Sequence, residues 1–431
     1  MSIYTSPETS PSPIAILCSE YVQSVEAMAE SLPFIMSTLI EAEDTFDKKL
    51  DAFIDFHAID VEKLEDGRRY GLKLEDKSAH DRLHRRIRVF REALGVTPRS
   101  FLVALVSAYD AFLGRLIRSL FYARPELLNS SERVLTFAQL QDLQTLDAAR
   151  EYLVEKEVES VLRKSHSQQF EWLEKTFSVP LRKGLECWPR FIELTERRNL
   201  FVHADGIVSS QYLNVCGEHG VTHSEVLTSG TRLHVERSYF QLSAHCLMEI
   251  GIKLAHVLWR KLVPTDREKA DENLIEIVYD LLIKQKYRLA ADLASFGTNT
   301  IKSHGSDQTR RILVVNLAIA HKFGGDAEKC TAVLDAEDWS ATADDFRLAI
   351  AALRDNFDEA AKLMKSIGKD NRLGMFEYRE WPVFRDFRKS YQFAAAYKEV
   401  FGEEFVLKAQ EPKASESPQT TAKGENVLDE E

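Results

Sequence analysis

Signatures of several common enzyme classes are missing from this 431-residue sequence. It has no Gly-x-x-x-x-Gly-Lys-Ser/Thr loop, no Gly-x-Gly-x-x-Gly fingerprint, no His-Glu-x-x-His motif and no Gly-x-Ser-x-Gly elbow. Nucleotide-driven, nicotinamide-dependent and serine-hydrolase activities therefore have no support. We expect no cofactor and no bound metal.

Long apolar runs and regular cysteine spacings are also lacking. The longest apolar stretches, such as Phe101–Val106, are far shorter than the ~20 residues that span a bilayer. Residues 1–13 are rich in Ser, Thr and Pro and do not resemble a signal peptide. The 5 cysteines are irregularly spaced, which favours reduced thiols over a disulfide framework. We expect a soluble, cytoplasmic protein without a membrane partner.

An excess of basic residues is absent as well, because the formal net charge is −12. This argues against a surface coated for binding duplex nucleic acid. A negative net charge remains compatible with a local basic groove, because phosphates are bound by basic patches and not by the net charge.

Helical periodicity is what the sequence has in abundance, so we predict an all-α fold. Residues 14–56 read as one or two amphipathic helices broken near Pro33, residues 62–77 as a polar linker, and residues 80–94 as a basic helix. Thr97-Pro98 is a good helix start, and a wide apolar stripe then runs to about Tyr122. Further helices are predicted over 137–146, 148–164, 188–203 and 239–262. The helix at 188–203 should end near Gly206 in the left-handed conformation.

A small β-hairpin is predicted within residues 212–236, where short β-prone stretches alternate with glycines. Beyond Pro264, short helical segments of similar size follow one another, with alanines at their packing positions. They loosely resemble tetratricopeptide-type repeats, which form α-solenoids. Four regions are expected: an N-terminal helical region (1–95), a central helical domain (96–263), a helical-repeat domain (264–406) and a disordered tail (407–431).

The segment from Arg197 to His203 is the most informative stretch of the chain. In a helix, Asn199 and His203 share a face because they are four residues apart, and the long side chain of Arg198 can reach around to them. An imidazole can accept or deliver a proton near neutral pH. A planar cation can stabilise the extra charge on a phosphorane. This set suits RNA cleavage by the 2′-hydroxyl without a metal.

Arg198-Asn199 followed by three residues and His203 resembles the Arg-x(4–6)-His motif of HEPN domains. The continuation Asp205-Gly206-Ile207-Val208 is similar to that family as well, and Ser107–Leu113 resembles its earlier helix, which carries an acidic residue, here Asp110. The resemblance covers roughly residues 97–262. It implies a HEPN-type helical bundle with Arg198, Asn199 and His203 in the site and with Asp110 beside them.

The same resemblance implies a homodimer in which two motif helices face each other across one cleft. The implied activity is a metal-independent endoribonuclease that leaves a 2′,3′-cyclic phosphate, acting as a toxin or an effector of antiviral defence or stress response. The helical repeats would bind a protein partner or sense a trigger. Two alternatives stay open: a non-catalytic dimerisation scaffold whose repeats bind a protein ligand, and nucleotide binding or nucleotidylation.

Each candidate residue also has a structural interpretation. Arg198 and His203 suit the C-terminal dipole of a helix in any protein, and Asp110 could serve only as a buried partner for an arginine of the motif helix. Cys216, His219 and His223 have ligand chemistry, but a tetrahedral site wants a fourth ligand. The basic run Arg82–Arg91 reads as an RNA contact or as a solvated helix face paired with acidic neighbours. The aromatic run Trp381–Phe387 favours core packing over nucleotide stacking.

Overall fold

The structure is a computed structural model, and it describes residues 12–65, 67–130, 134–222, 227–369 and 373–406. The chain is mostly helical, as predicted. It divides into two compact units, residues 1–334 and 335–431. The helices of the first unit are α1 (Pro13–His57), α2 (Leu74–Ala123), α3 (Phe137–Leu143), α4 (Leu146–Leu162), α5 (His166–Phe177), α6 (Trp188–His203), α7 (Ser210–Glu218), α8 (Arg237–Leu262), α9 (Arg267–Ile283), α10 (Tyr287–Ser295) and α11 (Asp307–Phe323).

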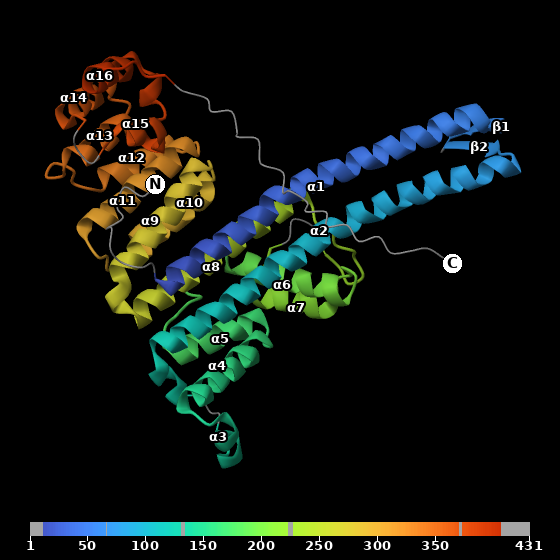
Figure 1. Cartoon of the computed structure of the whole chain (residues 1–431), viewed down its shortest axis with the longest axis horizontal. Helices are drawn as coiled ribbons and strands as arrows, with labels where there is room; N and C mark the ends of the chain where they lie inside the picture. The colour runs from blue at the N-terminus through green and yellow to red at the C-terminus, as the bar shows by residue number, and fades with distance from the viewer. Residues whose placement is uncertain (1–11, 66, 131–133, 223–226, 370–372, 407–431) are drawn as a thin grey trace, which may run out of the picture. The chain divides into compact units, whose positions relative to one another are not determined.

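Helices α1 and α2 lie side by side in antiparallel directions, and a β-hairpin joins them (Figure 1). The hairpin strands are β1 (Ile59–Leu64) and β2 (Gly67–Gly71), paired with Leu64 opposite Gly67. They are the one sheet among the described residues. The polar linker predicted over residues 62–77 is therefore wrong. The polar side chains of this segment are compatible with a hairpin, because both faces of the hairpin are largely exposed.

The predicted break near Pro33 is wrong, because α1 continues through it. A proline inside a helix deprives the carbonyl four residues earlier of its N–H donor. Here that carbonyl belongs to Ala29, and the side chain of Gln241 on α8 donates a hydrogen bond to it at 2.8 Å. The separate helix start predicted at Thr97-Pro98 is wrong as well, since α2 is continuous from Leu74 to Ala123.

The core of the first unit lies where α8 packs against both α1 and α2. The ring of Tyr21 on α1 stacks on Phe112 of α2 with centroids 4.2 Å apart, and its hydroxyl donates to the carbonyl of Leu247 on α8 at 2.7 Å. Helix α2 is long and apolar enough to span a membrane by composition. Half of its most apolar window is buried inside the protein, as in the core helix of a globular unit.

The small β-hairpin predicted within residues 212–236 is wrong, because residues 210–218 form α7. Tyr212 and Cys216 are buried at helical spacing on one face of this helix, and Ser209 caps it by accepting a hydrogen bond from the amide of Tyr212. The following segment makes one isolated bridge, between Ile207 and Arg232. Part of the predicted hairpin, residues 223–226, lies outside the described residues.

The boundary between the compact units lies at Leu334–Asp335, whereas the sequence predicted a boundary at 263/264. Helix α9 packs on α1 and α8. Lys284, at the end of α9, also forms an ion pair with the buried Glu26 of α1 at 2.6 Å. The first helices of the predicted repeat region therefore belong with the helices that precede them.

The second unit contains α13 (Asp344–Leu353), α14 (Phe357–Ile367), α15 (Met375–Glu380) and α16 (Tyr391–Phe401), and α12 (Ala327–Asp335) runs up to the boundary. Helix α14 packs against α13 and α16. In the segment Trp381–Phe387, Val383, Phe384 and Phe387 are buried. Its predicted role in core packing is confirmed. The predicted disordered tail lies outside the described residues, which end at residue 406.

Candidate functional site

The motif helix α6 begins at Trp188 and ends at His203, as predicted. Its buried face carries Phe191 and Leu194, which fixes the direction in which the polar residues of the next turns point. Gly206 follows with φ at +77°, and a Cβ on this residue would lie 2.8 Å from the ring of Phe201. The left-handed turn after the helix is therefore confirmed, and only glycine fits it without strain.

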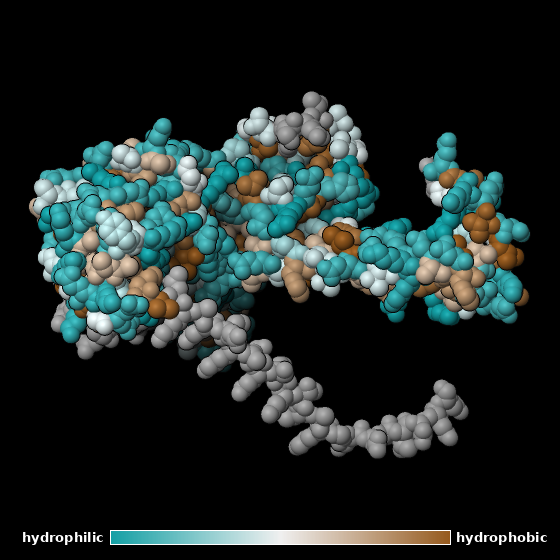
Figure 2. Space-filling model, turned by 90° about the horizontal axis from the view of Figure 1, so that it is seen from above, coloured by the Kyte–Doolittle hydropathy of each residue, from teal (hydrophilic) through white to brown (hydrophobic). Residues whose placement is uncertain are grey.

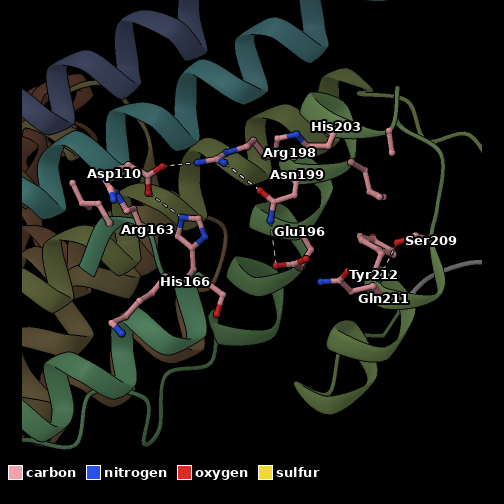
Figure 3. A pocket seen from close by; sticks show the side chains of 15 residues that line it. Asp110, Arg163, His166, Glu196, Arg198, Asn199, His203, Ser209, Gln211 and Tyr212 are labelled. Carbon is pink, nitrogen blue, oxygen red and sulfur yellow. Dashed lines mark hydrogen bonds and ion pairs between the residues drawn. The ribbon is translucent and has the colours of Figure 1, made fainter. Parts of the chain in front are cut away.

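A cleft of about 450 Å³ brings together all four residues that the sequence singled out: Asp110, Arg198, Asn199 and His203 (Figure 3). Asp110 comes from α2 and the other three from α6. The guanidinium of Arg198 donates through Nη2 to Oδ2 of Asp110 at 2.6 Å. The predicted contact between Asp110 and an arginine of the motif helix is confirmed.

Asn199 holds the other side of the guanidinium. Its Oδ1 accepts a hydrogen bond from Nη1 of Arg198 at 3.1 Å, and its Nδ2 donates to Glu196 at 3.4 Å. Arg198 and Asp110 are both about four-fifths buried at their side chains. The cation is thus held at two points in a partly desolvated place, where charge-assisted hydrogen bonds are strong.

His203 lies one turn beyond Asn199 and lines the same cleft. Its side chain is exposed, and it makes no hydrogen bond or ion pair with another residue of the described ranges. Its imidazole is therefore accessible to a ligand in the cleft.

His166 is the residue of the cleft that sequence reasoning missed. It is the first residue of α5, whose cap is Ser165, and its Nε2 donates to Oδ1 of Asp110 at 2.9 Å. Asp110 therefore links a histidine and an arginine from two other helices. The Ser-x-x-Gln capping box over Ser165–Gln168 was the only local signal, and it marks a helix start without showing what lies next to it.

Basic side chains border this site. Arg163 and Lys164 line the cleft next to His166, at the turn that leads from α4 into α5. The two residues add positive charge where a phosphate backbone would approach.

Another face of α6 carries a cluster of hydrogen-bonded polar side chains. The buried carboxylate of Glu193 accepts hydrogen bonds from Arg197 at 2.6 Å, Tyr212 at 2.7 Å and Tyr239 at 2.7 Å. Burial, and then the charge of Glu193, raise the pKa of Tyr212 well above its ordinary value. Its hydroxyl is therefore a fixed hydrogen-bond donor. This cluster joins α6 to α7 and α8 and thereby fixes the orientation of the motif helix.

The possible metal ligands Cys216, His219 and His223 do not form a site among the described residues. Burial raises the pKa of the Cys216 thiol to about 11, so the thiol is protonated at neutral pH. Nδ1 of His219 accepts a hydrogen bond from the indole of Trp188 at 3.3 Å. His223 lies outside the described residues.

The basic run on α2 is paired in part with α1. Arg91 binds Glu43 at 2.6 Å and Asp47 at 3.1 Å, so the predicted pairing with acidic neighbours is confirmed for this residue. Its role in contacting RNA stays a prediction.

Comparison with known proteins gave no matching family model, no matching curated protein and no matching solved structure.

Proposed function

We propose that the cleft around Arg198 and His203 is the active site of a metal-independent endoribonuclease. The observation that carries this proposal is the guanidinium of Arg198, fixed by Asp110 and Asn199 beside the exposed imidazole of His203. The resemblance of this motif to HEPN domains supports the same reading.

In the proposed reaction, His203 removes the proton of an RNA 2′-hydroxyl, and the 2′-oxygen attacks the adjacent phosphorus. The 2′-oxygen–phosphorus bond forms as the bond to the 5′-oxygen breaks. Each Nη of Arg198 keeps a hydrogen beyond the one given to Asp110 or Asn199. These hydrogens are available to the oxygens of the phosphorane.

The leaving 5′-oxygen needs a proton, and the HEPN resemblance suggests its source. In a dimer with facing motif helices, the protonated His203 of the second copy would deliver it. The products are a 2′,3′-cyclic phosphate and a 5′-hydroxyl. We therefore propose that one complete site requires two chains, and that the enzyme acts as a toxin or an effector of defence or stress response.

The test uses the full chain and a labelled RNA in the presence of EDTA. General acid–base groups contribute about 10²- to 10⁴-fold to rates, so His203→Ala should lower cleavage by at least about 100-fold. His234→Ala removes another exposed histidine of the same unit and should cleave like the wild type. Equal cleavage by wild type and His203→Ala would show that the proposed chemistry is wrong.

Arg198→Ala should also lose activity while keeping its helical circular dichroism signal. A loss of helical content would mark Arg198 as structural. Light scattering tests the dimer, which should be present in wild type and in His203→Ala.

A second candidate function is that of a non-catalytic interaction scaffold. Apolar side chains gather at the hairpin end of α1 and α2 (Figure 2), and Phe56 and Leu74 there are 85 % and 87 % exposed. Exposed apolar patches commonly mark contact sites. This reading predicts that wild type and His203→Ala behave alike with every RNA.

A further inference from the structure

A second cleft of the first unit, of about 690 Å³, contains a cluster of three side chains suited to a metal ion. His245 and Glu249 lie one turn apart on α8, and Asp292 comes from α10. One ligand atom from each residue lies within 4.8 Å of the other two. The cluster shares no residue with the cleft around Arg198.

The distances within the cluster are close to those of a coordination sphere. Nε2 of His245 is 2.8 Å from Oδ2 of Asp292 and 3.8 Å from Oε2 of Glu249. Two ligand atoms bound to one tetrahedral zinc ion at about 2.1 Å lie about 3.4 Å apart. A bound ion would replace the hydrogen bond between His245 and Asp292, and these two atoms would have to move apart by about 0.6 Å.

The carboxylate of Glu249 is oriented so that its Oε2 faces the cluster and can coordinate an ion. Its side chain is 9 % exposed, and Lys253 binds its other oxygen, Oε1, at 2.5 Å. Hydrogen bonds that orient a coordinating carboxylate are a common part of metal sites. Lys253 would hold Glu249 in the required orientation without occupying Oε2.

The cleft also offers a place for an anion. Arg190 and Arg288 line it, both are exposed, and neither makes an ion pair with another residue of the described part of the chain. Three protein ligands leave a coordination position open, as in zinc sites that bind water or substrate. An anion bound at that position would lie among these arginines.

We propose that His245, Glu249 and Asp292 bind a divalent cation of the zinc type, whose open position takes a phosphate-bearing ligand from this cleft. Magnesium and calcium prefer sites with oxygen ligands only, whereas an imidazole together with two carboxylates suits zinc. The inference is independent of the nuclease proposal, because nuclease activity is measured in EDTA and cation binding is measured without RNA.

The full chain, first stripped with EDTA, is titrated with Zn²⁺ by calorimetry. We expect one tight site, weakened by at least about 100-fold in His245→Ala and in Asp292→Asn, since even indirect partners of metal ligands are worth 10- to 100-fold in affinity. Asp292→Asn preserves size at a position 38 % exposed, so it tests the site even if His245→Ala does not fold. His234→Ala should bind Zn²⁺ like the wild type.

Co²⁺ provides a second measurement, because its visible absorption bands report the coordination geometry. The bands should appear in wild type, be lost in Asp292→Asn and shift when inorganic phosphate is added. Arg288→Ala should require several-fold more phosphate for the same shift. Unchanged Zn²⁺ binding in Asp292→Asn would leave the three residues as an ion-pair cluster and overturn the metal site. Bands that do not respond to phosphate would overturn the anionic ligand.

Discussion

Asp110→Asn tests how the cleft holds its arginine. The carboxylate accepts hydrogen bonds from Arg198 at 2.6 Å and from His166 at 2.9 Å. The amide keeps one accepting oxygen but carries no negative charge, so one of the two bonds is weakened and the other is lost. Hydrogen bonds to charged groups contribute about 1.5–3 kcal/mol each. We expect the free energy of unfolding of the first unit to fall by about 1.5–3 kcal/mol.

The same substitution should slow the proposed RNA cleavage by about 10- to 100-fold, because 1.4 kcal/mol of lost positioning corresponds to a factor of ten. The assays are cleavage of a labelled RNA and unfolding in urea. The matched control is Glu20→Gln, which removes a 2.6 Å ion pair between α1 and Arg115 of α2. That pair is half exposed and should contribute less than about 1 kcal/mol. If Asp110→Asn keeps the stability and the rate of Glu20→Gln, the ion pair does not hold the arginine as described.

Two further predictions concern stability. Gly251→Ala should lower the free energy of unfolding by about 1–3 kcal/mol, because the added Cβ would lie 2.5 Å from the ring of Tyr21. Gly95→Ala, whose Cβ would have nothing within 4 Å, should raise the free energy of unfolding by about 0.5–1 kcal/mol. Equal shifts in melting temperature would refute the packing argument. Burial, and then the charge of Arg260, lower the pKa of His256 to about 3. As the pH falls, the unfolded chain therefore binds a proton at His256 before the folded chain does. The free energy of unfolding should decline below about pH 6.5, by about 2 kcal/mol at pH 5. His256→Leu should flatten this decline in urea unfolding measured at pH 5 and 8, whereas an unchanged slope would assign it to other groups.

The sequence predicted the helices well where apolar residues recur at helical spacing. The bounds of α6 match the prediction, since its apolar face and the glycine that follows it are both local signals. The errors at Pro33 and at residues 212–236 have a different cause. In the first case a side chain distant in sequence, Gln241, satisfies the carbonyl freed by the proline. In the second, β-prone residues form α7 because Tyr212 and Cys216 are buried together.

The candidate site was predictable to the extent that its residues share one helix. Arg198, Asn199 and His203 follow from their spacing, and Asp110 from the resemblance. His166 and the cluster around His245 were not predictable, because their partners come from other helices. The packing of α5 and α2 against α6, and of α10 against α8, brings these side chains together.

The hydrogen bond between Gln241 and the carbonyl of Ala29 has a consequence for the order of folding. Before α8 docks, a helix over residues 13–57 lacks one hydrogen bond, because Pro33 has no N–H to donate to the carbonyl of Ala29. This segment should then behave as two shorter helices. The donor is 212 residues away along the chain, and its arrival requires a large loop to close. During folding, the amides on both sides of Pro33 should therefore become protected from hydrogen exchange late and together. This protection should appear when the core forms, and not when the local helices form.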